Sequence, residues 1–234
     1  MAIESATSDA SAENPADDSA AENQGTADIE SAFGMGGELT HEQANARYIK
    51  LQAGYHGFAL IAALALWGAA DSWALISNLA LAGVFAIIAS IAFGIAMAHI
   101  LHEWSHFFGA HLSGARYTVK EKPAFLFFDF DYEQNTRKQF LSMSMGGTVG
   151  NLIFLALVLF CIPLDSAGRT MLLAVGIGMM VYVSVIEFPV IRLASGGKTA
   201  MEALIEHFGK GPAILNMATM YGVLAALISW FLLS

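Results

Sequence analysis

The fold is decided by one apolar stretch, residues 74–113, which reads ALISNLALAGVFAIIASIAFGIAMAHILHEWSHFFGAHLS. Among Asp, Glu, Lys and Arg it contains only Glu103. A helix needs about 20 apolar residues to cross the roughly 30 Å hydrocarbon core of a bilayer, because each residue adds about 1.5 Å. The stretch is therefore predicted to form a transmembrane helix, and its excess length predicts that it tilts, breaks or projects from the membrane.

Four further apolar segments are each long enough, or nearly so, to cross a bilayer. They are residues 54–71, 140–163, 168–191 and 211–233. Gly68, Asp71 and Ser72 mark the predicted end of the first span. Over all 234 residues, 56% are hydrophobic and only 13% are charged, which is far from the balance of a soluble domain. The sequence predicts an all-α polytopic membrane protein with five transmembrane helices in a lipid bilayer.

The acidic net charge comes from the N-terminal segment. Residues 1–45 hold ten of the 20 Asp and Glu residues and neither Lys nor Arg. They are predicted to be a disordered acidic tail, because they offer too little apolar surface to offset the entropy of ordering. A docking arm and a merely solvating tail both remain open. Residues 46–234 form the predicted membrane domain, with a core at 74–200, and no basic stripe there suits a nucleic-acid partner.

The basic residues predict the orientation of the chain. All but one of the 11 fall in connections that the five spans place on the same side of the membrane. These are Arg47, Lys50, Arg116, Lys120, Lys122, Arg137, Lys138, Arg192, Lys198 and Lys210, and Arg169 alone lies on the other side. The positive-inside rule then predicts a multi-pass protein with a cytoplasmic N-terminus and an external C-terminus.

His102 and His106 are four residues apart, so on a helix both imidazoles project from one face and can reach the same metal ion. Two neutral imidazoles leave room at a zinc ion for a third protein ligand and a water. Glu103 lies beside them and would take the proton of that water as general base. Ionisable residues are rare in an apolar span unless they serve a site, which favours a zinc-hydrolase site over two core histidines.

The connection after this helix contains residues 123–132, PAFLFFDFDY, which are rich in strand-forming aromatic residues. A strand would place Leu126, Phe128, Phe130 and Tyr132 on one face and Phe125, Phe127, Asp129 and Asp131 on the other. We expect a short β-strand or hairpin at the membrane surface. Two roles remain open, an edge at which Phe128 and Phe130 bind an extended substrate, and a packed interfacial hairpin.

Residues 102–114, HEWSHFFGAHLSG, resemble the zinc helix of the site-2 protease family of intramembrane metalloproteases. Residues 147–151, GTVGN, are similar to the Gly-Pro-x-x-Asn signature of the family's next span, with Thr148 in place of proline. The resemblance covers about residues 74–200. It implies one Zn²⁺ per chain held by His102 and His106, catalysis by Glu103, and hydrolysis of a peptide bond in a membrane-protein substrate. It also implies a role for Asn151 in substrate binding.

The third zinc ligand departs from the family pattern. The family carries Leu-Asp-Gly-Gly in its third core span, and residues 193–197 read LASGG, so Ser195 stands where the family has its Asp ligand. Glu187 is the candidate replacement, and the alternative is a protonated or paired structural glutamate. It lies about two helical turns from Ser195, which predicts that it reaches zinc only if the segment is unwound or shifted. A catalytically inactive scaffold or binding protein is therefore the alternative to the enzyme.

Overall fold

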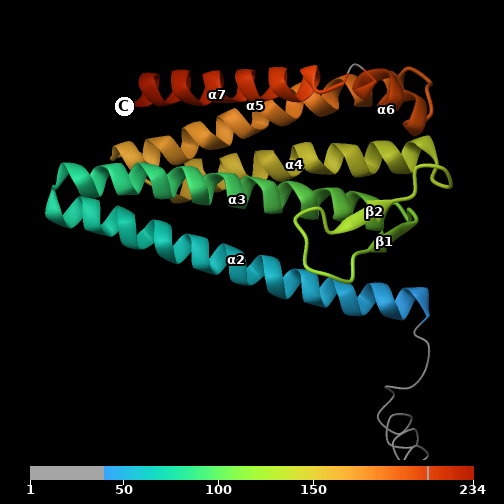
Figure 1. The fold of residues 1–234 in the computed structure, drawn as a ribbon, viewed down its shortest axis with the longest axis horizontal. Helices are drawn as coiled ribbons and strands as arrows, with labels where there is room; N and C mark the ends of the chain where they lie inside the picture. The colour runs from blue at the N-terminus through green and yellow to red at the C-terminus, as the bar shows by residue number, and fades with distance from the viewer. Residues whose placement is uncertain (1–39, 210) are drawn as a thin grey trace, which may run out of the picture. The chain divides into compact units, whose positions relative to one another are not determined.

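The structure is a computed structural model that describes residues 40–209 and 211–234. Of the tail predicted to be disordered, residues 1–39 lie outside the described residues, whereas residues 41–45 are helical, so the predicted disorder is wrong there. The described chain forms six helices and two strands (Figure 1). Their bounds are α2 His41–Ser77, α3 Ala80–Leu112, β1 Tyr117–Val119, β2 Phe128–Phe130, α4 Arg137–Cys161, α5 Ala167–Ser195, α6 Ala200–Phe208 and α7 Ala213–Leu233.

Five of these helices, α2, α3, α4, α5 and α7, are long and apolar enough to cross a membrane. Their outward faces carry exposed large apolar side chains, among them Phe58, Ile76, Phe160 and Phe231. Lipid solvates such a surface, whereas a soluble monomer rarely exposes so much of it. The protein is an all-α polytopic membrane protein with a two-stranded sheet, as the sequence predicted.

The predicted end of the first span near Asp71 is wrong. Helix α2 continues to Ser77, and the chain reverses at Asn78, whose φ of 52° is left-handed. Asp71 is only 5% exposed. It remains inside the helix because its carboxylate lies 2.8 Å from a guanidinium nitrogen of Arg169 on α5. The prediction ended the helix at the charged residue Asp71, whereas in the structure that charge is paired with Arg169.

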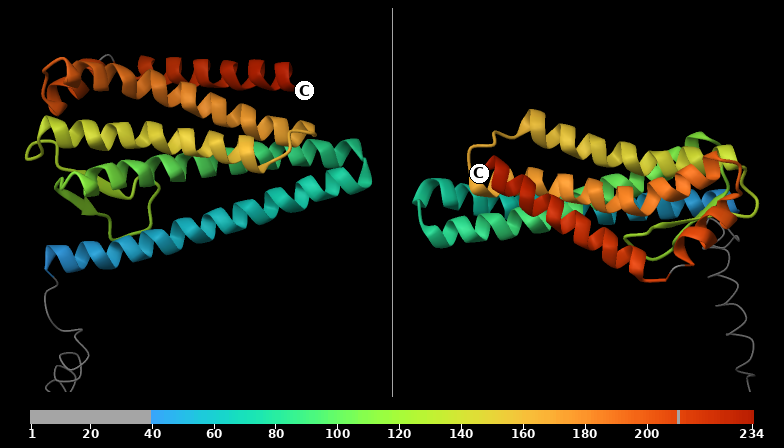
Figure 2. Two further views of the ribbon diagram at one scale, coloured as in Figure 1. Left: turned by 180° about the vertical axis from the view of Figure 1, so that it is seen from behind. Right: turned by 90° about the horizontal axis from the view of Figure 1, so that it is seen from above.

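Helices α3, α4 and α5 pack against one another, and α7 runs along α5 (Figure 2). Glycines allow α3 and α4 to approach at backbone distance, because a Cβ on Gly146 or Gly150 would overlap the carbonyl groups of Ser105 or Leu101. The core among these helices contains Phe93, Phe154 and Leu172, which are almost fully buried. This close packing fixes the face of α3 that carries the two histidines.

The hairpin lies between α2 and the C-terminal half of α3 (Figure 1). Strands β1 and β2 pair antiparallel, with Tyr117 opposite Phe130 and Val119 opposite Phe128. The predicted strand over residues 123–132 is therefore shortened to three residues, and the expected alternation fails before it. Phe127 is fully buried against Val119. Strand β1 was not predicted, since three residues are too few to show a period of two.

Helix α2 closes the outer edge of this sheet with polar side chains. The carboxamide of Asn45 makes the two hydrogen bonds to β1 that the backbone of a neighbouring strand would make. It donates to the carbonyl of Tyr117 at 3.2 Å and accepts from the N–H of Val119 at 2.9 Å. Gln52, fully buried, donates to the carbonyls of Lys120 and Lys122 at 2.8 Å each. The edge of β1 is therefore occupied, which leaves only the other edge of the sheet, on β2, for further pairing.

Candidate metal centre

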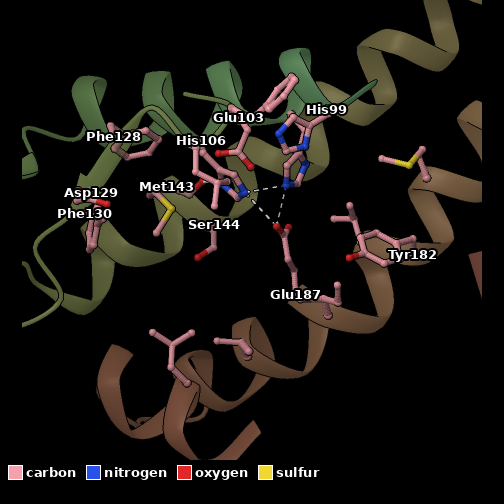
Figure 3. Close-up of a pocket in the computed structure, with 18 of the residues that line it drawn as sticks. His99, Glu103, His106, Phe128, Asp129, Phe130, Met143, Ser144, Tyr182 and Glu187 are labelled. Atoms are coloured by element: carbon pink, nitrogen blue, oxygen red, sulfur yellow. Dashed lines mark hydrogen bonds and ion pairs between the residues drawn. The ribbon is translucent and has the colours of Figure 1, made fainter. Parts of the chain in front are cut away.

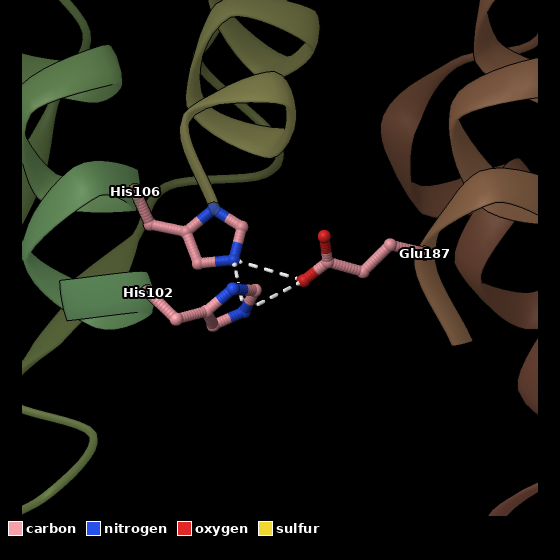
Figure 4. Close-up of side chains that lie close together, drawn as sticks. All are labelled: His102, His106 and Glu187. Carbon is pink, nitrogen blue, oxygen red and sulfur yellow. Dashed lines mark hydrogen bonds and ion pairs between the residues drawn. The ribbon is translucent and has the colours of Figure 1, made fainter. Parts of the chain in front are cut away.

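Three side chains from two transmembrane helices meet at one point (Figure 4). His102 and His106 lie one turn apart on α3, and their Nε2 atoms are 2.9 Å apart. Glu187 reaches over from α5 and places Oε1 2.9 Å from each of these nitrogens. The three residues predicted as ligands are thus brought together as a group that could hold a metal ion.

Glu187 takes this position without any break in its helix. Helix α5 is continuous from Ala167 to Ser195 with Pro189 inside it, so of the two expected alternatives, an unwound or a shifted segment, the unwound one is wrong. Ser195 is the exposed last residue of α5, about two turns further on, and does not line the site. The expectation failed because it took the register of α5 from Gly196 and Gly197.

The donor set fits a divalent transition metal. Ligands on a tetrahedron with bonds of about 2.0–2.1 Å are separated by roughly 3.3 Å, so the three donors need only a small outward adjustment. Glu187 Oε2 is buried and, among the described residues, has no hydrogen-bond partner, so a nearby cation would compensate its charge. Two imidazoles and one carboxylate suit zinc, and the same set occurs with non-haem iron.

Helix α4 shapes the space that the imidazoles fill. The Nδ1 of His106 lies 2.7 Å from the carbonyl oxygen of Met143, which can only accept, so the neutral ring carries its proton on Nδ1. Its Nε2 is then a bare lone pair that faces His102 and Glu187. One turn later Gly147 leaves room for both rings, because a Cβ there would overlap His102 Cε1 and His106 Nε2. Asn151, a further turn along, contacts His102 Nδ1 at 3.2 Å.

The three donors open onto a cavity of about 970 Å³ enclosed by α3, the hairpin, α4, α5, α6 and α7 (Figure 3). Glu103, His99 and Tyr182 also line it, among mainly apolar and aromatic side chains. Glu103 is 9% exposed and makes no hydrogen bond among the described residues. A mainly apolar cavity with a few converging polar side chains is the usual composition of a ligand-binding pocket.

Strand β2 forms one wall of this cavity through Phe128, Asp129 and Phe130. The N–H of Lys120 bonds to the carbonyl of Phe127, so alternate residues of β2 face β1. Phe128 and Phe130 therefore direct their backbone N–H and C=O groups away from β1, toward the open edge. Of the three residues predicted to contact substrate, Phe128 and Phe130 line the cavity, whereas Asn151 is 1% exposed and does not line it.

Two residues of the hairpin add polar groups that the sequence did not single out. Lys120 lines the cavity and pairs with Asp129 at 3.4 Å. Tyr132 also lines it, and burial raises the pKa of its phenol, helped by the negative charges of Glu103 and Asp129. The phenol therefore stays a hydrogen-bond donor at neutral pH.

The two aspartates of the hairpin are not part of the metal-binding group. Asp131 accepts hydrogen bonds from the N–H groups of Glu133 and Gln134 and so caps a turn, while Asp129 pairs with Lys120. Glu187 remains the carboxylate that joins the two histidines.

We find no match to this chain among protein-family models, curated proteins or solved structures. The fold and the site together define a polytopic membrane protein with a candidate metal centre between its helices.

Proposed function

We propose that this protein is an intramembrane zinc metalloprotease that hydrolyses a peptide bond of a membrane protein, as its resemblance to the site-2 protease family implies. The observation that carries the proposal is the placement of Glu103 on the cavity wall beside His102, His106 and Glu187. Glu103 is not a member of the metal-binding group, yet it is buried and faces the cavity, which is where a general base acting on a water has to lie. Hydrolysis favours zinc over iron for this donor set.

His102, His106 and Glu187 would hold the ion. A zinc ion there would supply a Lewis acid for the scissile carbonyl and would lower the pKa of an attacking water toward neutrality. Glu103 would accept a proton from that water while the water oxygen bonds to the carbonyl carbon. The carbon–nitrogen bond then breaks, and Glu103 delivers the proton to the departing amine nitrogen, which restores the carboxylate.

The substrate must be extended where it is cut, because a helical peptide hides its carbonyl groups in internal hydrogen bonds. The open edge of β2 offers the N–H and C=O groups of Phe128 and Phe130 to such a segment, inside the same cavity as Glu103. Pairing there would hold a short unwound piece of a membrane-spanning substrate as a third strand. The mainly apolar lining suits the side chains of a transmembrane sequence.

The alternative of a catalytically inactive scaffold rested on Ser195 at the family's ligand position. The serine at this position argues less strongly for an inactive protein, because Glu187 contributes a carboxylate to the metal-binding group and Ser195 lies at the end of α5. Both proposed roles place the protein in a membrane. They differ in whether Glu103 matters for what the protein does.

Two measurements on protein purified in detergent test the proposal. The first is its metal content, and the second is cleavage of a transmembrane reporter substrate. We expect one zinc per chain and cleavage of the reporter. His106→Ala should lose both, because two ligands hold zinc far more weakly than three. A wild-type protein that binds zinc and leaves every reporter intact would favour the scaffold.

A further inference from the structure

We propose that Asn151 is a positioning residue for the metal centre, one that orients His102 and keeps its proton on Nδ1, away from the ion. This inference rests on the proposed metal site. It concerns the imidazole of His102 and gives Asn151 a task other than contact with substrate. Four observations on α4 carry it.

The first observation is a regular stripe on α4. Met143, Gly147 and Asn151 are spaced four residues apart, so they lie one above another on the face that packs against α3. Met143 supplies an acceptor to Nδ1 of His106, Gly147 leaves space for both rings, and Asn151 contacts Nδ1 of His102. Each imidazole thus has its own partner on α4 at the nitrogen that faces away from Glu187.

The second observation is that both rings need the same protonation to bind one ion. A metal takes the Nε2 lone pair of a neutral imidazole, so the proton must sit on Nδ1. The Met143 carbonyl imposes this on His106 because it can only accept. His102 needs an acceptor of the same kind at its own Nδ1, and Asn151 is the residue that reaches it.

The third observation concerns the two ends of the Asn151 carboxamide. Its Nδ2 lies 3.2 Å from His102 Nδ1, while its Oδ1 is buried without a hydrogen-bond partner among the described residues. The two ends of a carboxamide have nearly the same shape, so a half-turn brings Oδ1 to Nδ1 and places Nδ2 where Oδ1 lay. Oδ1 then accepts the Nδ1 proton, and the bare Nε2 of His102 faces Glu187 and His106.

The fourth observation is burial. Asn151 is 1% exposed and does not line the cavity. A peptide in the cavity would reach His102 and Glu103 without touching the carboxamide behind them. Asn151 therefore acts on the reaction only through His102.

The test measures zinc affinity, by competition with a chromophoric chelator, for the full chain in detergent. Asn151→Leu keeps a similar volume and removes the acceptor, and we expect zinc to bind about 10–100-fold more weakly, the usual effect of losing an outer partner of a ligand. Asn151→Asp retains an acceptor and should stay within about tenfold of wild type. Cobalt-loaded protein should show an altered visible spectrum for Asn151→Leu only.

Thr148→Val is the matched control. Thr148 is buried on the same helix, and its hydroxyl makes no hydrogen bond among the described residues, so zinc affinity should not change. Wild-type affinity in Asn151→Leu overturns the inference, and so do equal losses in the Leu and Asp variants. If zinc affinities follow the expected order and the wild-type protein cleaves no reporter, the positioning role stands and the protease falls. If Asn151→Leu binds zinc and cleaves like wild type, the protease stands and the positioning role falls.

Discussion

Gly147 is a single residue on which the geometry of the centre depends. A side chain there would overlap atoms of both imidazoles, at a place where Gly146 and Gly150 let α4 lie directly against the backbone of α3. We predict that Gly147→Ala lowers zinc affinity by at least about tenfold, as disturbing the groups around a ligand does. Metal analysis of purified protein checks this. Gly83→Ala is the control, since its Cβ would meet nothing within 4 Å, and equal zinc in both variants would contradict the prediction.

Glu187 carries the second prediction at this scale. Glu187→Ala removes the only carboxylate in the metal-binding group, so zinc occupancy and cleavage should fall together. Adding Ser195→Asp should rescue neither, because residue 195 is exposed at the end of α5 about two turns away. Zinc content and reporter cleavage are measured on the single and double variants. Full zinc in Glu187→Ala would make Glu187 a structural residue.

At the scale of residues, the sequence identified the side chains of the centre and not its supports. His102, Glu103 and His106 follow from spacing alone, and Glu187 stood out as an ionisable group in an apolar span. The Met143 carbonyl could not be found in this way, because a backbone oxygen leaves no mark on residue identity. The four-residue spacing of Gly147 and Asn151 was visible, but it becomes meaningful only once α4 is known to pack against α3.

At the scale of elements, helix ends and strand lengths depended on partners far along the chain. Helix α2 passes through Asp71 because Arg169, 98 residues later, neutralises it. A buried carboxylate without a partner would be strongly unfavourable, but the guanidinium of Arg169 compensates its charge. The apolar helix can therefore continue through Asp71. A short strand or hairpin was predicted over residues 123–132, but a strand at Tyr117–Val119 was not. Its outer edge is shaped by Asn45 and Gln52 on α2, which no local pattern connects to it.

Strand β2 gives a prediction about substrate binding. Phe128→Pro removes the N–H at the open edge, while Phe128→Ala keeps it and removes only the ring. If substrate pairs with β2, Phe128→Pro should lower kcat/KM roughly five- to tenfold below Phe128→Ala, about the worth of one backbone hydrogen bond. Zinc content should stay equal, because Phe128 is not in the metal-binding group. Equal kcat/KM in the two variants would place the substrate elsewhere.

At the scale of the whole molecule, five apolar helices follow directly from composition and segment length. Their packing does not, because it depends on which glycines meet which backbone. The single basic residue on the far side, Arg169, is paired with Asp71 and Asp165 at 2.8 Å each. The positive charge of Arg169 is therefore neutralised by neighbouring carboxylates, and it hardly reduces the excess of basic residues on the opposite side.

The orientation gives a prediction at this scale. Ten of 11 Lys and Arg residues on one side predict a cytoplasmic N-terminus and an external C-terminus. The metal centre would then lie toward the cytoplasmic side, near the hairpin end of α3. Of two reporters fused after Ser234, we expect activity from the one that functions only outside the cytoplasm and none from the one that functions only inside it. Activity of a cytoplasm-specific reporter alone would show that the orientation is reversed.

The proposed protease depends most directly on one carboxylate. Glu103→Gln keeps the size of the side chain and all three members of the metal-binding group, but it removes the proton acceptor. The decisive measurement is zinc content and reporter cleavage on the same purified sample of this variant. We predict one zinc per chain and cleavage reduced at least about 100-fold, in line with the loss of a general base. Undiminished cleavage by zinc-loaded Glu103→Gln would contradict the proposed mechanism.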